Sequence, residues 1–241
     1  MKFLTKVTIL VSLLAIGFGT TFATTTDTLQ LTAGGNIVRI QDNGTCVNIV
    51  GTACTGILGD LDPTAGTDTV SGSLGGWKIS VTSGTSNSPS DVPFGLDLSS
   101  LTATCSVGGA CAGGSLDVQY SDINFSPSNP AFLTQYSATL NGTGSTSERA
   151  YFSNSNTQFA ETTLIGLVGP FTATNHGSAT GGVGSVAPYS LTLDQVFTDS
   201  GSAVSFSVDG SVSSVPEPAA VVLLGTVLLF CASKLRRRRA S

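Results

Sequence analysis

Short stretches of alternating apolar and polar residues recur along the middle of the chain. Residues 28–32 and 36–40 alternate on either side of Gly34-Gly35, which predicts a β-hairpin. Residues 77–81 and 116–121 have the same period of two, with Trp77 on one apolar face. This period places one set of side chains on each face of a strand, so it predicts strands that are buried on one side.

The second half of the chain continues the pattern. Phe132 to Leu140 and Ala150 to Ser153 predict two strands around a turn at residues 141–144. Phe159 to Val168 is the most apolar stretch and is predicted to be a central strand buried on both faces. Residues 189–193 are predicted to pair with residues 204–208 across the turn signal Asp199-Ser200-Gly201.

Many short strands separated by turn signals indicate an all-β fold. We therefore predict a single antiparallel β-sandwich or jelly-roll-like domain over residues 24–210, followed by a short tether at residues 211–215. At this length one domain suffices.

The N-terminus has the three parts of a secretory signal peptide. Lys2 and Lys6 form the positive region, Val7 to Phe18 the apolar region, and Thr21-Phe22-Ala23 the small-residue cleavage site. We place the signal peptide at residues 1–23, which predicts export and an N-terminus at Thr24.

The C-terminus has a proline-flanked acidic residue, a short apolar run and a basic end. Residues 219–233 would form roughly 22 Å of helix, short of a hydrocarbon core of about 30 Å. The arginines that follow would stay on the cytoplasmic side. A permanent membrane anchor is one interpretation of this segment.

Val215-Pro216-Glu217-Pro218, the apolar run and the basic end together resemble the PEP-CTERM sorting signal of Gram-negative bacteria. The resemblance implies recognition of Pro216, Glu217 and Pro218 by a membrane transpeptidase called exosortase, with residues 219–233 as a transient inner-membrane anchor. The basic stop would be Lys234, Arg236, Arg237, Arg238 and Arg239. It also implies release to the cell surface or extracellular matrix, where such proteins are associated with exopolysaccharide. The match is confined to this tail and lends no activity to residues 24–214.

The part expected to remain after processing is strongly acidic. Residues 24–215 hold three basic residues, Arg39, Lys78 and Arg149, against fourteen acidic ones, a formal charge of −11. Nucleic-acid binding is excluded, because phosphate contacts depend on Lys and Arg. Such a charge favours solubility and binding of divalent cations.

Four cysteines lie in the exported region: Cys46, Cys54, Cys105 and Cys111. An even number in an oxidising compartment predicts disulfides. Three pairings are possible, and proximity in the sequence favours Cys46–Cys54 and Cys105–Cys111, worth roughly 2–3 kcal/mol each. A zinc site is the weaker interpretation, since no His or CxxC accompanies them.

Residues 59–68 contain the best candidate for a metal site. Asp60, Asp62 and Asp68 offer oxygen ligands of the kind that Ca²⁺ prefers. The spacing departs from an EF-hand, because Ala65 stands at the required glycine position and Ser71 at the bidentate glutamate position. A solvated acidic loop is the alternative.

Aromatic residues raise the question of sugar binding. Trp77 would stack on a pyranose ring if it were exposed, as would Tyr120, Tyr136, Tyr151 or Tyr189. In β-sandwiches, however, aromatic residues more often belong to the core. Trp77 is therefore a conditional candidate for carbohydrate contact.

Signals for catalysis are sparse. His176 is the only histidine and no Gly-x-Ser-x-Gly elbow accompanies it. Glycoside hydrolysis needs two opposed carboxylates, and Glu148 and Glu161 are the only glutamates between signal peptide and sorting motif. We expect a non-enzymatic surface or matrix protein associated with exopolysaccharide. The alternatives are a carbohydrate-binding module and a secreted glycoside hydrolase.

Overall fold

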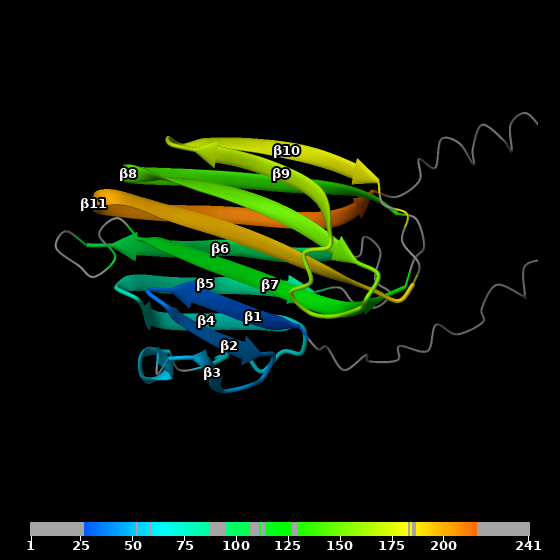
Figure 1. The fold of residues 1–241 in the computed structure, drawn as a ribbon, viewed down its shortest axis with the longest axis horizontal. Coiled ribbons are helices and arrows are strands. Elements are labelled where there is room, and N and C mark those ends of the chain that lie inside the picture. Colours follow the sequence, from blue (N-terminus) through cyan, green and yellow to red (C-terminus); the bar gives the residue numbers. More distant parts are fainter. Residues whose placement is uncertain are drawn as a thin grey trace, which may run out of the picture.

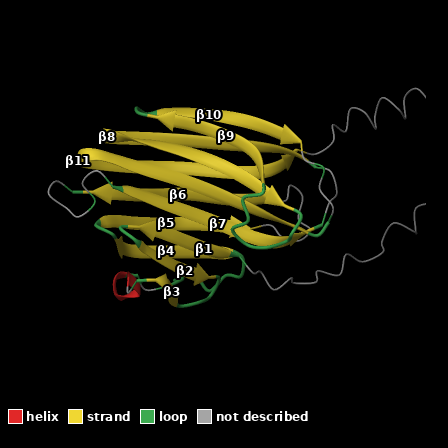
Figure 2. Ribbon diagram, viewed as in Figure 1, coloured by secondary structure: helices red, strands yellow, loops and turns green. Residues whose placement is uncertain are grey.

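The computed structural model describes residues 27–51, 53–57, 59–86, 95–106, 111, 114–126, 130–182, 184 and 187–215. Its elements are β1 (Thr28–Ala33), β2 (Asn36–Gln41), β3 (Cys46–Val50), the 3-10 helix η1 (Ala53–Gly56), β4 (Thr67–Leu74), β5 (Trp77–Ser86), β6 (Gly95–Cys105), β7 (Ser115–Phe125), β8 (Ala131–Ser153), β9 (Thr163–Phe171), β10 (Asn175–Gly182) and β11 (Tyr189–Val215). Strands account for nearly all of this part of the chain (Figure 2). The prediction of an all-β antiparallel domain is confirmed.

The strands form two layers that pack face to face (Figure 1). Sheet I has the order β3-β2-β1-β7-β11-β8-β9, and sheet II has the order β4-β5-β6-β11-β8-β10. All the pairings are antiparallel. Hydrogen bonding runs on from one layer into the other, because β8 and β11 belong to both.

The two long strands β8 and β11 pair with each other from end to end and fold over together. The N-terminal half of β11 pairs with β7 and the C-terminal half of β8, whereas its C-terminal half pairs with β6 and the N-terminal half of β8. The register shifts between Asp199 and Val204, opposite Gly142 and Gly144. Both strands turn back at this end of the molecule (Figure 1).

This arrangement corrects two predictions. Residues 189–193 do not pair with residues 204–208. Both segments belong to β11, but the first lies in sheet I and the second in sheet II, and each pairs with a different part of β8. Residues 141–144 do not separate two strands that form a hairpin, since β8 continues through them. The turn signals mark a shared bend of a two-stranded ribbon.

The core lies between the layers. Phe197 of sheet I and Phe206 of sheet II have ring centroids 5.2 Å apart, and Phe132 of sheet II meets Tyr189 of sheet I edge-on at 6.4 Å. Aliphatic residues at alternating positions of β1, β5, β6 and β7 complete the interior. Alternation in the sequence predicted the buried faces of β1, β5 and β7 correctly, whereas β6 was not among the predicted strands.

The β1–β2 hairpin is also as predicted. Gly34 and Gly35 both have positive φ, 58° and 78°, which permits the two-residue turn between Ala33 and Asn36. At the other end, residues 211–215 are the last residues of β11 rather than a tether, and Val212 is buried. The folded domain thus extends to Val215.

The apolar stretch at residues 159–168 is not a central strand. Its first residue, Phe159, lies in a loop at residues 154–162, which we call the strap, and β9 begins only at Thr163. β9 is an edge strand that pairs with β8 alone, and Leu164 and Leu167 are about half exposed. Sequence apolarity here does not reflect burial on both faces.

No helix among the described residues is long and apolar enough to cross a membrane. The predicted signal peptide at residues 1–23 and the sorting signal at residues 216–239, with its helix at 219–233, lie outside the described residues.

Candidate functional site

Both predicted disulfides are present. Cys46 of β3 bonds Cys54 of η1, and Cys105 of β6 bonds Cys111, with Cα atoms 5.6 Å and 6.2 Å apart. The first bond holds the loop that follows β3, close to the acidic residues described next. Of the three possible connectivities, the one favoured by proximity is the one observed.

Three aspartates converge where the edges of the two sheets meet. Asp42 follows β2 of sheet I, Asp60 lies in the loop before β4, and Asp68 lies in β4 of sheet II. One carboxylate oxygen from each falls within 4.8 Å of the other two. Of the predicted trio, Asp60 and Asp68 therefore come together, and Asp42 takes the place that was assigned to Asp62.

Backbone N–H groups hold two of these carboxylates. Asp60 Oδ1 accepts hydrogen bonds from the N–H groups of Asp62 and Thr69, and its Oδ2 accepts one from Asn43. Asp42 Oδ2 accepts one from Gly66. These bonds fix the loops at residues 42–45 and 59–69 against each other, because each carboxylate binds backbone from the other loop.

Asp62 has a different role. Its Oδ1 accepts the N–H of Thr64 at 2.8 Å, and hydrogen bonds from the side chain and then the backbone of Thr64 lower its pKa. It does not belong to the converging group. The prediction of Asp62 as a metal ligand is corrected, since its carboxylate stabilises the turn of its own loop.

Asp68 is the buried member of the trio, and a fourth aspartate, Asp27, is buried beside it. Burial raises the pKa of Asp68 to about 9, and the charges of Asp27, Asp60 and Asp42 add to the rise. Burial also raises the pKa of Asp27 to about 6, against the hydrogen bond that Tyr120 donates to it at 2.5 Å. The four carboxyl groups thus lie close enough for the charge of one to raise the pKa of another.

A second feature lies on the outer face of sheet II. Two adjoining hollows, of about 280 Å³ and about 230 Å³, share Asp97 and Ser211 and form what we call the polar groove. The strand register aligns Thr85, Asp97, Ser211 and Gln135 in a row across β5, β6, β11 and β8. The next row contains Asp209, Ser137 and His176. The groove therefore crosses the strands, and its lining combines these polar side chains with Leu96, Tyr136 and Val212.

Asp97 and Asp209 are the acidic groups of the polar groove. Asp209 Oδ1 accepts the N–H of Ser100 at 2.6 Å, where a bulge interrupts the pairing of β6 with β11. Asp97 Oδ1 is shielded from solvent and has no hydrogen-bond partner, and burial raises the pKa of Asp97. None of the described residues that line the groove is Lys or Arg. The groove can accept several hydrogen bonds from a ligand.

Trp77 is not at this surface. It is 0% exposed and its ring packs 6.2 Å from that of Phe206 in the core. Tyr120, Tyr136 and Tyr189 are buried as well, and Tyr151 is half-buried. Trp77 is therefore a core residue that offers no face to a sugar, because the alternation that made it prominent places it between the sheets.

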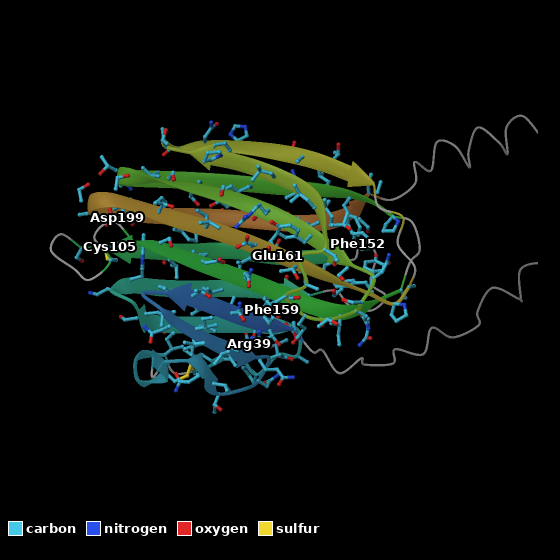
Figure 3. All side chains as sticks on the ribbon, in the orientation of Figure 1. Arg39, Cys105, Phe152, Phe159, Glu161 and Asp199 are labelled. Atoms are coloured by element: carbon cyan, nitrogen blue, oxygen red, sulfur yellow. A yellow bond between two sulfur atoms is a disulfide. The ribbon has the colours of Figure 1, made fainter. Side chains whose placement is uncertain are left out.

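Glu148 and Glu161 lie on opposite faces of sheet I. Glu148 points into the core, where Gln195 donates a hydrogen bond to it at 2.9 Å. Glu161 belongs to the strap and accepts a hydrogen bond from Gln119 on the outer face, near Phe159 and Arg39 (Figure 3). They do not share a cleft, as a pair of hydrolytic carboxylates would.

The other residues singled out in the sequence lie in three different places: the polar groove, the bend of β11 and the C-terminal tail. His176 is exposed on β10 at the end of the polar groove. Asp199 Oδ1 accepts the N–H groups of Gly201 and Ser202 and so caps the bend of β11. The sorting residues Pro216, Glu217, Pro218, Lys234 and Arg236–Arg239 lie outside the described residues.

Sequence reasoning missed Asp27, Asp42 and the groove residues Asp97, Gln135 and Asp209. No local spacing signals them, because each group is assembled from several strands that are distant in sequence. The acidic composition of residues 24–215 was the one signal that could have prompted a search for such groups.

No protein-family model and no curated protein sequence matches this chain. Several solved structures share part of the fold. They include the bacteriophage CBA120 tailspike protein 4 domain, at 11% identity over 58% of this chain, with TM-score 0.32; the chain spans only 19% of that protein. TmCBM61 in complex with β-1,4-galactotriose has 7% identity, with 58% of this chain and 88% of that one covered and TM-score 0.33. The CBM22-1 xylan-binding domain of Paenibacillus barcinonensis Xyn10C has 13% identity, with 64% and 88% covered and TM-score 0.29. All these TM-scores are below 0.5, so the similarity assigns neither a family nor a ligand to this chain.

Proposed function

We propose that this β-sandwich is a non-enzymatic, exported surface or matrix module that binds polysaccharide through the polar groove of sheet II. The observation that carries the proposal is the row of polar side chains across the strands, at the point where two hollows adjoin. A ligand that extends across the strands would meet Asp97, Ser211 and Gln135 in turn.

The chemistry of the groove suits a polyhydroxylated ligand. Carboxylates accept hydrogen bonds from sugar hydroxyls, and the Gln135 amide and serine hydroxyls both donate and accept. Asp97 lines both hollows and is only half-buried, so part of its carboxyl group is open to such a ligand. Because the described lining holds carboxylates and no Lys or Arg, a neutral polysaccharide fits better than an acidic one.

Export supports the same proposal. The predicted signal peptide and the resemblance of the tail to a PEP-CTERM signal together predict a route out of the cell and processing by exosortase. The two disulfides suit an oxidising compartment. A protein that is released outside the cell and carries a polar groove has the extracellular polysaccharide as its nearest available ligand.

Affinity electrophoresis of the full chain in mild detergent tests the proposal. The gel would contain the neutral polysaccharide of the producing strain's matrix, with alginate as the acidic comparison. We expect retardation by the neutral polymer only. Asp97→Ala combined with Gln135→Ala should abolish it. Ser207→Ala, on the same face of β11 but outside the groove, should bind as the wild type does. Equal retardation of the double variant and the wild type, or none for the wild type, would refute groove binding.

A further inference from the structure

The four aspartates Asp27, Asp42, Asp60 and Asp68 lie at the junction of the two sheets, apart from the polar groove. Asp27 precedes β1 and Asp42 follows β2, both in sheet I, whereas Asp68 is in β4 of sheet II. β1 and β4 contact each other at this edge, at the end of the molecule where β2 and β3 also lie (Figure 1). A ligand bound here would join the two layers.

Asp68 is the residue that points to a ligand. Its side chain is 0% exposed, and one of its oxygens is within 4.8 Å of those of Asp42 and Asp60. No described N–H or hydroxyl group donates a hydrogen bond to it, and the group within hydrogen-bonding reach is another carboxyl, that of Asp27. Asp27, also fully buried, has one oxygen without a partner. Buried carboxyl oxygens are almost always satisfied, because leaving them bare carries a large desolvation penalty.

No described basic side chain offsets this charge. Arg39 donates to Gln30 and lies over Phe159, and Arg149 forms an ion pair with Asp194 at 2.6 Å. Lys78 is exposed in β5, at the opposite end of that strand from Gly84, whose neighbours include Asp68 and Tyr120. Acidic groups this close repel one another unless a positive charge lies between them.

We propose that Asp42, Asp60 and Asp68, with Asp27 beside them, bind one Ca²⁺ that ties sheet I to sheet II. Three oxygens within 4.8 Å of one another leave a point no more than about 2.8 Å from each, so a small inward movement gives the roughly 2.3–2.6 Å that Ca²⁺ requires. The donors are all oxygen, which favours a hard cation over zinc or copper. Carboxylates from separate loops, supplemented by water or carbonyl groups, suit the irregular coordination of Ca²⁺ better than the strict octahedron of Mg²⁺.

The backbone bonds described above make the site ready for a cation. Asp42 and Asp60 are held in place by N–H groups of the opposite loop, so their ligand oxygens need little rearrangement. The site goes beyond polysaccharide binding and does not depend on it. It also differs from the predicted loop site, because it draws on Asp27 and Asp42 and excludes Asp62.

Terbium luminescence tests the site directly. Tb³⁺ replaces Ca²⁺ and emits when a nearby tyrosine is excited, and the Tyr120 hydroxyl is hydrogen-bonded to Asp27. We expect the full chain, purified in mild detergent and stripped with EGTA, to bind Tb³⁺ with emission that Ca²⁺ displaces. Calorimetry should give one Ca²⁺ per chain, and Mg²⁺ should bind at least about tenfold more weakly.

Two matched variants complete the experiment. Asp68→Asn should lower Ca²⁺ affinity at least about tenfold, because it removes a ligand oxygen. In EGTA its thermal midpoint should equal or exceed that of the wild type, because the carboxyl group then has no cation to bind. Asp62→Asn, in the same loop, should bind Ca²⁺ as the wild type does. If Asp68→Asn does not fold, Asp42→Asn serves for the affinity measurement. Absence of Ca²⁺ binding by the wild type, equal loss in the Asp62 variant, or equal affinity for Mg²⁺ would overturn the proposal.

Discussion

The carboxyl group of Glu148 occupies the space in which a side chain at position 210 would lie. Glu148 projects from β8 in sheet I, and Gly210 faces it from β11 in sheet II. A Cβ placed on Gly210 would collide with Glu148 Oε2 and Gln195 Nε2. Gly210 does not have a positive φ, so glycine is required here by the close approach of the two sheets and not by the backbone conformation.

Gly210→Ala should therefore lower the free energy of unfolding by about 1–3 kcal/mol, the usual cost of overfilling a packed interior. Urea denaturation monitored by tryptophan fluorescence would measure it. Gly182→Ala is the matched control, because a Cβ there would meet nothing within 4 Å. A similar change in both variants would show that the space beside Glu148 can adapt.

Glu148 should make stability depend on pH. Burial raises its pKa well above the usual 4.5, although the bond from Gln195 acts in the opposite direction. The folded protein thus retains a proton that the unfolded chain releases above about pH 4.5, so stability is greatest at low pH and falls as pH rises. The slope from this group is at most about 1.4 kcal/mol per pH unit.

Glu148→Gln should remove that slope. The variant and the wild type should have similar unfolding free energies near about pH 4, and the variant should be the more stable one near about pH 8, since glutamine has no proton to lose. Denaturation curves at several pH values give the comparison. A difference that does not change with pH would mean that Glu148 is ionised in the folded protein.

The two disulfides should stabilise the domain separately. Replacing Cys46 and Cys54 together by alanine, or Cys105 and Cys111 together, should each lower the unfolding free energy by roughly 2–3 kcal/mol, because each closes a small loop. Alkylation without prior reduction should label none of the four. Labelling of any of them in the native protein, or no change in thermal midpoint on reduction, would contradict this expectation.

Processing of the tail gives a further prediction. Intact-mass analysis of the exported protein should find that Arg236 to Arg239 have been removed, because the resemblance to a PEP-CTERM signal implies cleavage near Pro216-Glu217-Pro218. Changing both prolines to alanine should leave the protein in the membrane fraction. Ser202→Ala, at the exposed bend of β11, should be processed normally. Exported protein that retains its arginines would argue for a permanent anchor.

The sequence predicted what depends on local pattern. Alternation identified the buried faces of β1, β5 and β7, Gly34-Gly35 identified a turn, and proximity identified the disulfide partners. The bend shared by β8 and β11 was not predictable from the sequence. Residues such as Gly142 and Asp199-Ser200-Gly201 suit a hairpin turn, in which one chain reverses on itself, and equally a bend that two paired strands make together.

The candidate sites were harder to predict for a related reason. Asp60 and Asp68 were identified from their own loop, yet Asp42 reaches them from the preceding hairpin, and Asp27 from the start of β1. The groove residues Asp97 and Gln135 meet only through the register of β11 between β6 and β8. Such convergence is a property of strand order, which a single sequence does not specify.

The position of β11 has a mechanical consequence for a protein held by its C-terminus. Its final segment is hydrogen-bonded on both sides, to β6 and to β8, and ends at Val215, directly before the tail. Tension applied through the tail would act along a central strand and load two ladders of hydrogen bonds at once in shear, whereas an edge strand would be peeled away one bond at a time. A surface protein attached at this point would resist being pulled apart.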